Sequence, residues 1–414
     1  MQWVLGDLIG RYRPGVAWDE MFDAAGVPRP HYGPLYDVLG RLSSEEFEHR
    51  CAVRDRSFRD QGITFALSGE QRPFPLDLVP RIVPAEEWSV IEAGVAQRVR
   101  ALEAFLADVY SGASILADGV IPRRLVFSSR HFHRQAAGLV PPNGVRIHVA
   151  GIDIIRDHAG RYRVLEDNVR TPSGISYVIE NRRAMTHVFP ELFASYRVRA
   201  VGDYPAHLLS ALRAAAPFAA GREPTVVVLT PGVHNSAYFE HSFLARQMGV
   251  ALVEGRDLVC RSGVVYMRTT RGEERVDVVY RRVDDEYLDP VQFRPGSLLG
   301  CPGILNAARS GSVAIANAVG NGVADDKAVY PFVPEMVRYY LGEEPLLDNV
   351  DTFLLSDHDT RKHVLEHLDE LVLKPVDGSG GYGLVIGPQA SDEQLAGLPR
   401  GGLAFLGSTH CELN

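Results

Sequence analysis

The chain has 414 residues, more than one ordinary domain holds, so its length predicts two or three domains. With 46% hydrophobic and 23% charged residues it has a globular composition, which excludes disordered, collagenous and coiled-coil classes. Its net charge of −9 argues against nucleic acid or an anionic membrane as a partner, because both bind basic surfaces. A small anionic ligand held by a few local cations remains compatible with this charge.

The sequence also indicates a compartment. No run of about 18 apolar residues is present, so we expect no membrane-spanning segment. The first residues lack a basic stretch, and Asp7 interrupts their apolar run, so we expect no signal peptide. Four widely spaced cysteines are typical of a reducing compartment, without a disulfide frame or a thiolate metal site: Cys51, Cys260, Cys301 and Cys411. We therefore expect a cytoplasmic protein, and nothing in the sequence indicates its oligomeric state.

The N-terminal part is predicted to be partly irregular and partly helical. Residues 1 to about 80 are rich in Pro, Gly and aromatic residues and show weak periodicity, which favours short helices. The clearest helix begins after Pro84, with Glu86 and Glu87 in its first turn, and ends before Gly112. Apolar residues recur there at steps of three and four and predict one buried face: Trp88, Ile91, Val95, Val99, Leu102, Leu106 and Val109.

From residue 144 the apolar period changes to two, which predicts strands. We expect strands at residues 145–149, 151–156 and 161–168, the last two joined as a hairpin. Residues 225–229 form an apolar run followed by a turn and by a helix that ends at Gly249, and further strands follow. A strand, a turn, a helix and another strand in this order favour a parallel sheet with a right-handed crossover.

The last hundred residues contain a Gly/Ala/Asn-rich stretch, a charged helix near residues 357–370, and an apolar strand that delivers Lys374. A glycine-rich turn follows (Gly378, Ser379, Gly380, Gly381, Gly383), and then a second strand at residues 384–386. Glycines let backbone N–H groups converge on an anion, and a nearby ammonium adds charge. This arrangement favours a lid over a triphosphate, and the alternative is an ordinary hairpin with a surface lysine.

The predicted hairpin at residues 151–168 carries several acids. We expect Arg156 to pair with Arg161 across a four-residue loop, which places Asp153 opposite Val164. Because side chains alternate along a strand, Glu166 and Asn168 would share the face of Asp153.

Asp153 and Glu166 would then be diagonal neighbours, roughly 7–8 Å apart at Cα. Two carboxylates and an amide oxygen on one face suit Mg²⁺, which prefers oxygen ligands. The alternative is a solvated acidic hairpin. Next along the chain Arg170 could clamp a carboxylate or phosphate, although a lone arginine is more often a surface residue.

Seven stretches, in the same order, resemble the circularly permuted ATP-grasp proteins, a group related to the synthetase domain of glutathionylspermidine synthase. They cover about residues 20–397: GVPRPHYGPL, FRDQGITFALSG, RPFPLDLVPRIVPAEEW, HVAGIDIIRD, VLEDNVRTPSGISYVIENR, DDKAVYPFVPEM and VLKPVDGSGGYG. VLEDNVRTPSG with VLKPVDGSGGYG is the specific pair. The acids precede the lysine and the glycine-rich loop, which is the permuted order.

The resemblance implies a mixed α/β fold, a circularly permuted ATP-grasp with an inserted Rossmann-like subdomain and a partly irregular, helical N-terminal region. We expect five parts: an N-terminal region (1–140), a metal-binding part (141–222), a Rossmann-like subdomain (223–290), a Lys/Gly-loop nucleotide-binding part (291–397) and an atypical tail (398–414).

The resemblance also implies ligands and roles. ATP and Mg²⁺ would be used, with Asp153, Glu166 and Asn168 as metal ligands. The nucleotide phosphates would be bound by Lys327, Lys374, Gly378, Ser379, Gly380, Gly381 and Gly383. Arg170 and Ser173 would face the reacting carboxylate as catalytic residues.

The implied reaction joins a small-molecule or peptide carboxylate to an amine through an acyl phosphate. The match ends near Leu398, where the family continues through strands that hold the adenine, so we expect a truncated C-terminus that leaves the ligase inactive if those strands are required. The alternative is a non-catalytic nucleotide-binding or scaffold protein of the same fold.

Overall fold

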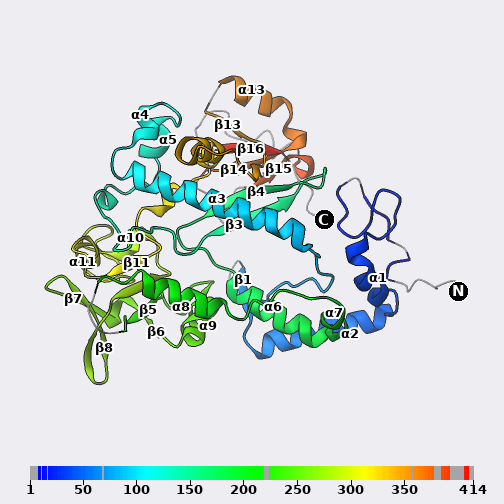
Figure 1. Ribbon diagram of the computed structural model, residues 1–414, viewed down its shortest axis with the longest axis horizontal. Coiled ribbons are helices and arrows are strands. Elements are labelled where there is room, and N and C mark those ends of the chain that lie inside the picture. The colour runs from blue at the N-terminus through cyan, green and yellow to red at the C-terminus, as the bar shows by residue number, and fades with distance from the viewer. Residues whose placement is uncertain are drawn as a thin grey trace. The chain divides into compact units, whose positions relative to one another are not determined.

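The computed structural model describes residues 8–10, 12–15, 17–67, 70–218, 223–356, 358–376, 384–391 and 405–409. Over these residues the chain is a mixed α/β protein with several sheets, as expected (Figure 1). It divides into two compact units, each assembled from two stretches of chain. Unit 1 comprises Met1–Ala85 and Ser173–Ala314, and unit 2 comprises Glu86–Pro172 and Ile315–Asn414. Our division into five parts stays a prediction.

Unit 1 combines helices with short sheets. Its helices are α1 (Gly33–Leu39), α2 (Ser44–Asp60), α6 (Ile175–Val188), α7 (Pro190–Ser195), α8 (Tyr204–Ala214), α9 (Tyr238–Met248), α10 (Asp285–Leu288) and α11 (Ile304–Arg309). Its strands are β1 (Thr64–Leu67), β2 (Glu70–Pro73), β5 (Val226–Leu229), β6 (Ala251–Val253), β7 (Leu258–Arg261), β8 (Val264–Thr269), β9 (Gly272–Arg275) and β10 (Val278–Arg281). The chain passes into unit 2 within β11 (Ala314–Ala316).

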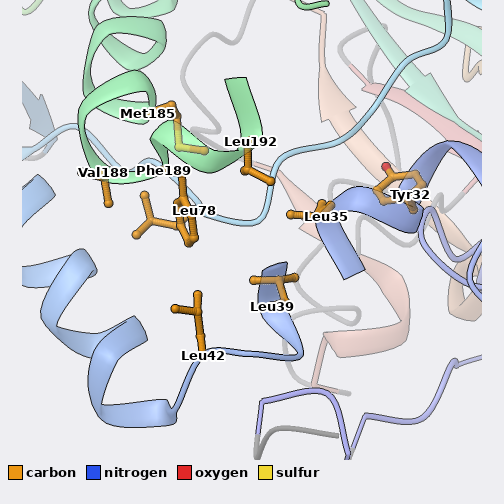
Figure 2. Packing of buried hydrophobic residues seen from close by; sticks show 9 residues of the cluster. All are labelled: Tyr32, Leu35, Leu39, Leu42, Leu78, Met185, Val188, Phe189 and Leu192. Atoms are coloured by element: carbon orange, nitrogen blue, oxygen red, sulfur yellow. The ribbon is translucent and has the colours of Figure 1, made fainter. Parts of the chain in front are cut away.

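The N-terminal residues of unit 1 are more helical than their weak periodicity predicted. Helix α2 has 17 residues, and its N-cap Ser43 accepts a hydrogen bond at Oγ from the N–H of Glu46 at 3.1 Å. A buried core joins α1 to α6 and α7 (Figure 2): Tyr32, Leu35, Leu39, Leu42, Leu78, Met185, Val188, Phe189 and Leu192. Residues far apart in the sequence therefore share one core in this unit.

The expected parallel sheet is present in unit 1 with strand order β11-β10-β5-β6. β5 pairs in parallel with both β10 and β6, and α9 connects β5 to β6. α9 ends at Gly249, as predicted, and the structure shows that this glycine adopts the left-handed conformation. Not all of the further strands expected after Gly249 join this sheet, because β8 belongs to a separate antiparallel sheet, β7-β8-β9.

Unit 2 carries the long helix and the predicted acidic hairpin. Its helices are α3 (Ala85–Val109), α4 (Ser114–Ala117), α5 (Arg123–Phe127), α12 (Val333–Met336), a following π-helix (Val337–Leu341) and α13 (His358–Glu366). Its strands are β3 (Gly151–Arg156), β4 (Tyr162–Asn168), β12 (Asp348–Asn349), β13 (Thr352–Leu354), β14 (Leu371–Pro375), β15 (Val385–Ile386) and β16 (Phe405–Thr409). The sheets have strand orders β12-β4-β3 and β13-β16-β14-β15.

Helix α3 runs along the β3–β4 hairpin (Figure 1). Its buried face begins at Ile91, so the prediction that Trp88 is buried was wrong: 43% of Trp88 is exposed. The predicted buried face therefore began one helical turn too early. The buried face also contains Gly94 and Arg98, which a search for apolar residues passes over.

The strand predicted at residues 145–149 does not form. Side chains satisfy its backbone N–H groups in place of a neighbouring strand. The carboxylate of Glu103 accepts from Arg146 and Ile147 at 2.7 and 2.8 Å, and Asn317 Oδ1 accepts from His148 and Val149 at 2.6 and 2.9 Å. Alternating apolar residues therefore did not identify a strand here, because the pairing partner is missing along this described segment.

The C-terminal segment forms a strand although it shows no strand period. β16 lies between β13 and β14 and pairs antiparallel with both. Residues 398–404 and 410–414 of the predicted tail lie outside the described residues. None of the described helices is both long enough and apolar enough to cross a membrane.

Candidate functional site

The hairpin that carries the predicted metal ligands forms with a different register from the expected one. Arg156 pairs with Tyr162, not with Arg161, because Asp157 donates its N–H to the carbonyl of Arg161 and so lengthens the turn. This slip of one residue would by itself turn Asp153 to the wrong face. A β-bulge next to Asp153 compensates for it.

As a result Asp153 lies directly opposite Glu166, and Gly151 lies opposite Asn168. Residues opposite each other, or two apart, on a strand pair project from the same face. Asp153, Glu166 and Asn168 therefore share one face. The predicted pairing of Asp153 with Val164 was wrong, because Val164 pairs with Ile154 and is buried on the opposite face.

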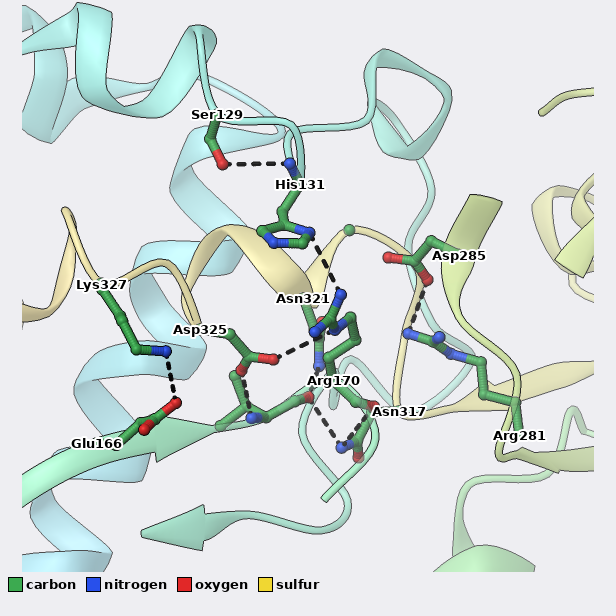
Figure 3. Close-up of polar contacts among 12 residues, drawn as sticks. Ser129, His131, Glu166, Arg170, Arg281, Asp285, Asn317, Asn321, Asp325 and Lys327 are labelled. Atoms are coloured by element: carbon green, nitrogen blue, oxygen red, sulfur yellow. Dashed lines mark hydrogen bonds and ion pairs between the residues drawn. The ribbon is translucent and has the colours of Figure 1, made fainter. Parts of the chain in front are cut away.

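Lys327 reaches this face from a loop far along the chain. Its Nζ lies 2.9 Å from Glu166 Oε1, and 15% of the lysine and 28% of the glutamate side chain are exposed (Figure 3). The residue predicted to bind phosphate thus contacts a residue predicted to bind the metal. Both would have to exchange this partner when a metal–nucleotide complex binds.

Lys374, on β14, lines the same pocket as Glu166 and Lys327. The pocket walls are Leu165, Glu166, Asp167, Asp325, Lys327, Tyr330, Val350, Thr352 and Lys374. The lining therefore combines two lysines and three carboxylates with the apolar residues Leu165 and Val350, a mixture that suits a charged ligand.

The predicted glycine-rich loop, which contains Gly378, Ser379, Gly380, Gly381 and Gly383, lies outside the described residues. The strands on either side of it, β14 and β15, pair antiparallel. Lys374 therefore stands near the end of a strand that leads into this loop.

Asp153 and Asn168 share a strand face with Glu166 but are not among the residues that line the pocket. Loss of hydration and the neighbouring carboxylates of Glu166 and Asp167 raise the pKa of Asp153, and Lys374 and Lys327 oppose the shift. A bound cation on this face would relieve the repulsion between Asp153 and Glu166.

Asp325 is a buried acid that sequence reasoning missed. Burial raises its pKa to about 7, although hydrogen bonds and the charge of Arg170 act in the opposite direction. Its Oδ1 accepts the N–H of Val169, the residue after Asn168, and its Oδ2 lies 3.5 Å from Arg170 Nε. The carbonyl of Val169 accepts from Asn317 and Asn321. The backbone just beyond β4 is thus fixed from both sides.

Arg170, predicted as a clamp for a substrate carboxylate, is half-buried. Besides Asp325, its Nη1 contacts His131 Nδ1 at 3.3 Å (Figure 3). Gly322 packs against both side chains, and a Cβ there would lie 3.0 Å from His131 Cβ and 3.2 Å from Arg170 Cδ. The guanidinium therefore has internal partners in this structure.

Ser173, the other residue predicted to be catalytic, belongs to unit 1. Its hydroxyl accepts a hydrogen bond from Arg282 Nη2. The buried Glu240 carboxylate accepts the N–H groups of Gly174 and Ser176 at 2.7 and 3.0 Å and so caps the start of α6. Ser173 is part of this capping cluster.

The sequence contained one signal for the missed residues. Asp325, Asp326 and Lys327 are three consecutive charges next to a stretch of small residues, and each contacts a different element. Asp326 accepts the Ser129 hydroxyl at 2.5 Å. Three consecutive charges beside small, apolar residues indicate a loop that joins several elements through buried ion pairs and hydrogen bonds.

Among the residues with a described placement, no group of three or more His, Cys, Asp or Glu side chains could hold a metal ion. The predicted set has two carboxylates and an amide. Mg²⁺ keeps water and phosphate oxygens in its remaining positions, so this donor set fits it. The residues present are compatible with the implied ion.

Comparison with known proteins identifies the family. The family model described as a circularly permuted ATP-grasp matches residues 80–401. The chain belongs to the circularly permuted ATP-grasp family. Membership supports an ATP-dependent ligase in general terms.

Several curated relatives share most of this chain. An uncharacterized protein of Mycobacterium tuberculosis is 62% identical over 383 residues, which are 92% of this chain and 69% of that protein. An uncharacterized Synechocystis protein is 51% identical over 93% of this chain and 81% of its own length. A Frankia alni protein, provisionally named a glutamate–cysteine ligase, is 47% identical over 94% of this chain but only 46% of its own length.

A solved structure shares the fold. A glutathione synthetase-like effector from Globodera pallida, in its apo form, superposes with a TM-score of 0.57 over 90% of this chain and 83% of that chain. Its sequence identity is 12%, so the likeness concerns the fold alone.

Proposed function

We propose that the chain is an ATP- and Mg²⁺-dependent ligase that joins a small-molecule or peptide carboxylate to an amine through an acyl phosphate. One observation carries this proposal: Glu166, Lys327 and Lys374 are distant in sequence but line the same pocket. Family membership supports it. The name of the Frankia relative adds nothing on substrates, because more than half of that protein lies outside the match.

Within this proposal each residue has a role. Asp153, Glu166 and Asn168 would hold Mg²⁺, and Lys327, Lys374 and the loop from Gly378 to Gly383 would hold the phosphates. The ion, when bound, supplies positive charge that stabilises the transferred phosphoryl group. The lysines do the same from the protein side and orient the phosphates for attack by the carboxylate.

Arg170 and Ser173 would orient the carboxylate substrate. Since Arg170 contacts His131 and Asp325, we expect these contacts to hold its guanidinium in place for a second anion. We keep the cytoplasmic location as part of the proposal, on the strength of the widely spaced cysteines.

The test is release of ADP by the full chain from ATP and Mg²⁺ with mixtures of carboxylates and amines. We expect ADP only when both substrates are present, and none from Glu166→Gln. Glu370→Gln, which neutralises an exposed carboxylate of unit 2 outside the pocket lining, is the matched control and should react normally.

The competing function predicts a different result. A non-catalytic nucleotide-binding or scaffold protein would bind ATP and Mg²⁺ but release no ADP from any mixture. Binding can be detected by a rise in Tm with ligand, because a ligand that binds only the folded state stabilises it. Binding without turnover would replace the ligase by this alternative.

A further inference from the structure

A buried ion pair lies behind the face that carries the predicted metal ligands. Arg98, on α3, donates from Nε and Nη2 to the two carboxylate oxygens of Asp167, both at 2.6 Å. Only 4% of the arginine and 1% of the aspartate side chain are exposed. A planar fork that meets a carboxylate with two parallel hydrogen bonds fixes orientation as well as distance.

The position of Asp167 gives this pair its significance. Asp167 lies between Glu166 and Asn168 on β4, and it pairs with Ile152 on the face that packs on α3. Because neighbouring side chains on a strand point to opposite faces, holding Asp167 on one face sets Glu166 and Asn168 on the other. The ion pair therefore fixes the strand backbone from which the side chains of Glu166 and Asn168 project.

Arg98 also links β4 to its neighbour. Its Nη1 donates to Asn349 Oδ1 at 2.7 Å, and Asn349 belongs to β12, which pairs with β4. The Asn349 amide donates to the carbonyl of Tyr330 at 2.9 Å, and the guanidinium carbon lies 5.4 Å from the centre of the Tyr330 ring. The same arginine therefore supports two strands and an aromatic residue.

These contacts extend to the pocket wall. Asp167 and Tyr330 both line the pocket, and so does Val350, whose N–H donates to the Tyr330 hydroxyl at 2.9 Å. Tyr330 in turn donates to the carbonyl of Val164 at 2.5 Å. One buried network thus connects α3, β4 and β12 to the lining that holds Glu166.

Charge gives a second reason for the pair. Asp167 is a third carboxylate next to Glu166 on β4, and Glu166 lies opposite Asp153 across the hairpin. Arg98 neutralises Asp167 and turns both of its oxygens toward α3. Without the arginine, Asp167 would add to the repulsion on the ligand face.

We propose that Arg98 and Asp167 are positioning residues of the metal–nucleotide site, which hold β4 so that Glu166 and Asn168 face one bound ion. This inference rests on the proposed function, and it adds residues that take no direct part in binding. Supporting residues of this kind typically change metal affinity by about 10- to 100-fold when they are substituted.

The experiment measures Mn²⁺ binding by electron paramagnetic resonance in the presence of a non-hydrolysable ATP analogue. Asp167→Asn and Arg98→Lys keep the size of the side chains but lose the bidentate pair. We expect each to bind Mn²⁺ about 10- to 100-fold more weakly than the wild type. We also expect a hyperfine spectrum that differs from that of the wild type, which loss of stability alone would not produce.

A second variant keeps the test valid if these proteins fold poorly. The double substitution Arg98→Met with Asp167→Leu replaces the buried pair by apolar groups, a change that often leaves stability intact. It should fold and still bind Mn²⁺ at least about 10-fold more weakly.

The matched control is Glu87→Gln. Glu87 also joins α3 to the hairpin, through Arg156 at 2.5 Å and the Tyr162 hydroxyl at 2.7 Å, but at the turn end. It should destabilise the protein and leave Mn²⁺ affinity unchanged. The proposal is overturned if the double variant binds Mn²⁺ as tightly as the wild type, or if Glu87→Gln weakens binding equally. A wild-type protein that binds no Mn²⁺ with the analogue overturns the proposed function itself, and this inference with it.

Discussion

The contact between Lys327 and Glu166 predicts that one substitution changes two affinities in opposite directions. Lys327 Nζ lies 2.9 Å from the Glu166 carboxylate, which is the group proposed to bind Mg²⁺. Lys327→Met removes this competitor and should strengthen binding of the metal alone. It also removes a cation from the phosphate site and should weaken binding of ATP with the metal.

The magnitude follows from the partial burial of the pair. Two unit charges at this distance attract by about 6 kcal/mol at an effective dielectric constant of about 20, but desolvation and ordering offset most of that. A charged hydrogen bond with limited exposure retains about 1–2 kcal/mol. Free Mn²⁺ should therefore bind roughly 5- to 30-fold more tightly to Lys327→Met.

Calorimetric titrations with Mn²⁺ alone, and then with ATP in saturating Mg²⁺, measure both effects. Lys362→Met is the control, because it removes the same charge from unit 2 at an exposed pair 4.0 Å long. It should change neither affinity. Equal Mn²⁺ affinities for wild type, Lys327→Met and Lys362→Met would refute the idea that the lysine competes with the metal.

Three further predictions concern stability. The raised pKa of Asp325, about 7 against 3.8, means that the folded protein binds a proton that the unfolded chain has lost, so this residue lowers stability as pH rises from about 4 to 7. Asp325→Asn should remove up to about 4 kcal/mol of this pH dependence. Urea unfolding across this pH range measures it, and the same change in unfolding free energy with pH for both proteins would argue against it. Glu240→Gln should cost about 3–5 kcal/mol by uncapping α6 and leaving Arg282 uncompensated, and a loss below about 1 kcal/mol in urea would contradict this. Gly94→Ala places a Cβ 2.4 Å from Leu347 Cγ and should lower stability by about 1–3 kcal/mol, whereas a raised Tm would contradict such close packing.

The sequence predicted individual helices and strands better than it predicted which strands pair with one another. Helices α3 and α9 and the β3–β4 hairpin follow from periodicity and from end signals such as Gly249. β16 does not, because its pairing with β13 and β14 stabilises a segment with no strand pattern of its own. Residues 145–149 show the opposite case, since the pattern is present and the neighbouring strand is not.

The candidate site shows the same division. Spacing placed Asp153 and Glu166 on one face, but only the structure shows the β-bulge that offsets a slipped register. The approach of Lys327 to Glu166 joins residues 161 positions apart, and no local rule predicts it. The sequence pattern does not identify Arg98 and Asp325 as buried, because a charged residue is expected at the surface unless its partner is known. Those partners, Asp167 and Arg170, are visible only in the structure.

The central claim is that the hairpin acids and the two lysines bind one metal–nucleotide complex. Its most direct test is calorimetric titration of ATP in saturating Mg²⁺ into wild type, Glu166→Gln and Lys374→Met. The account predicts that the wild type binds and that each substitution, made on a different sheet of unit 2, weakens binding at least about 10-fold, since each removes a charged contact with the same ligand. The same dissociation constant for all three proteins would contradict it.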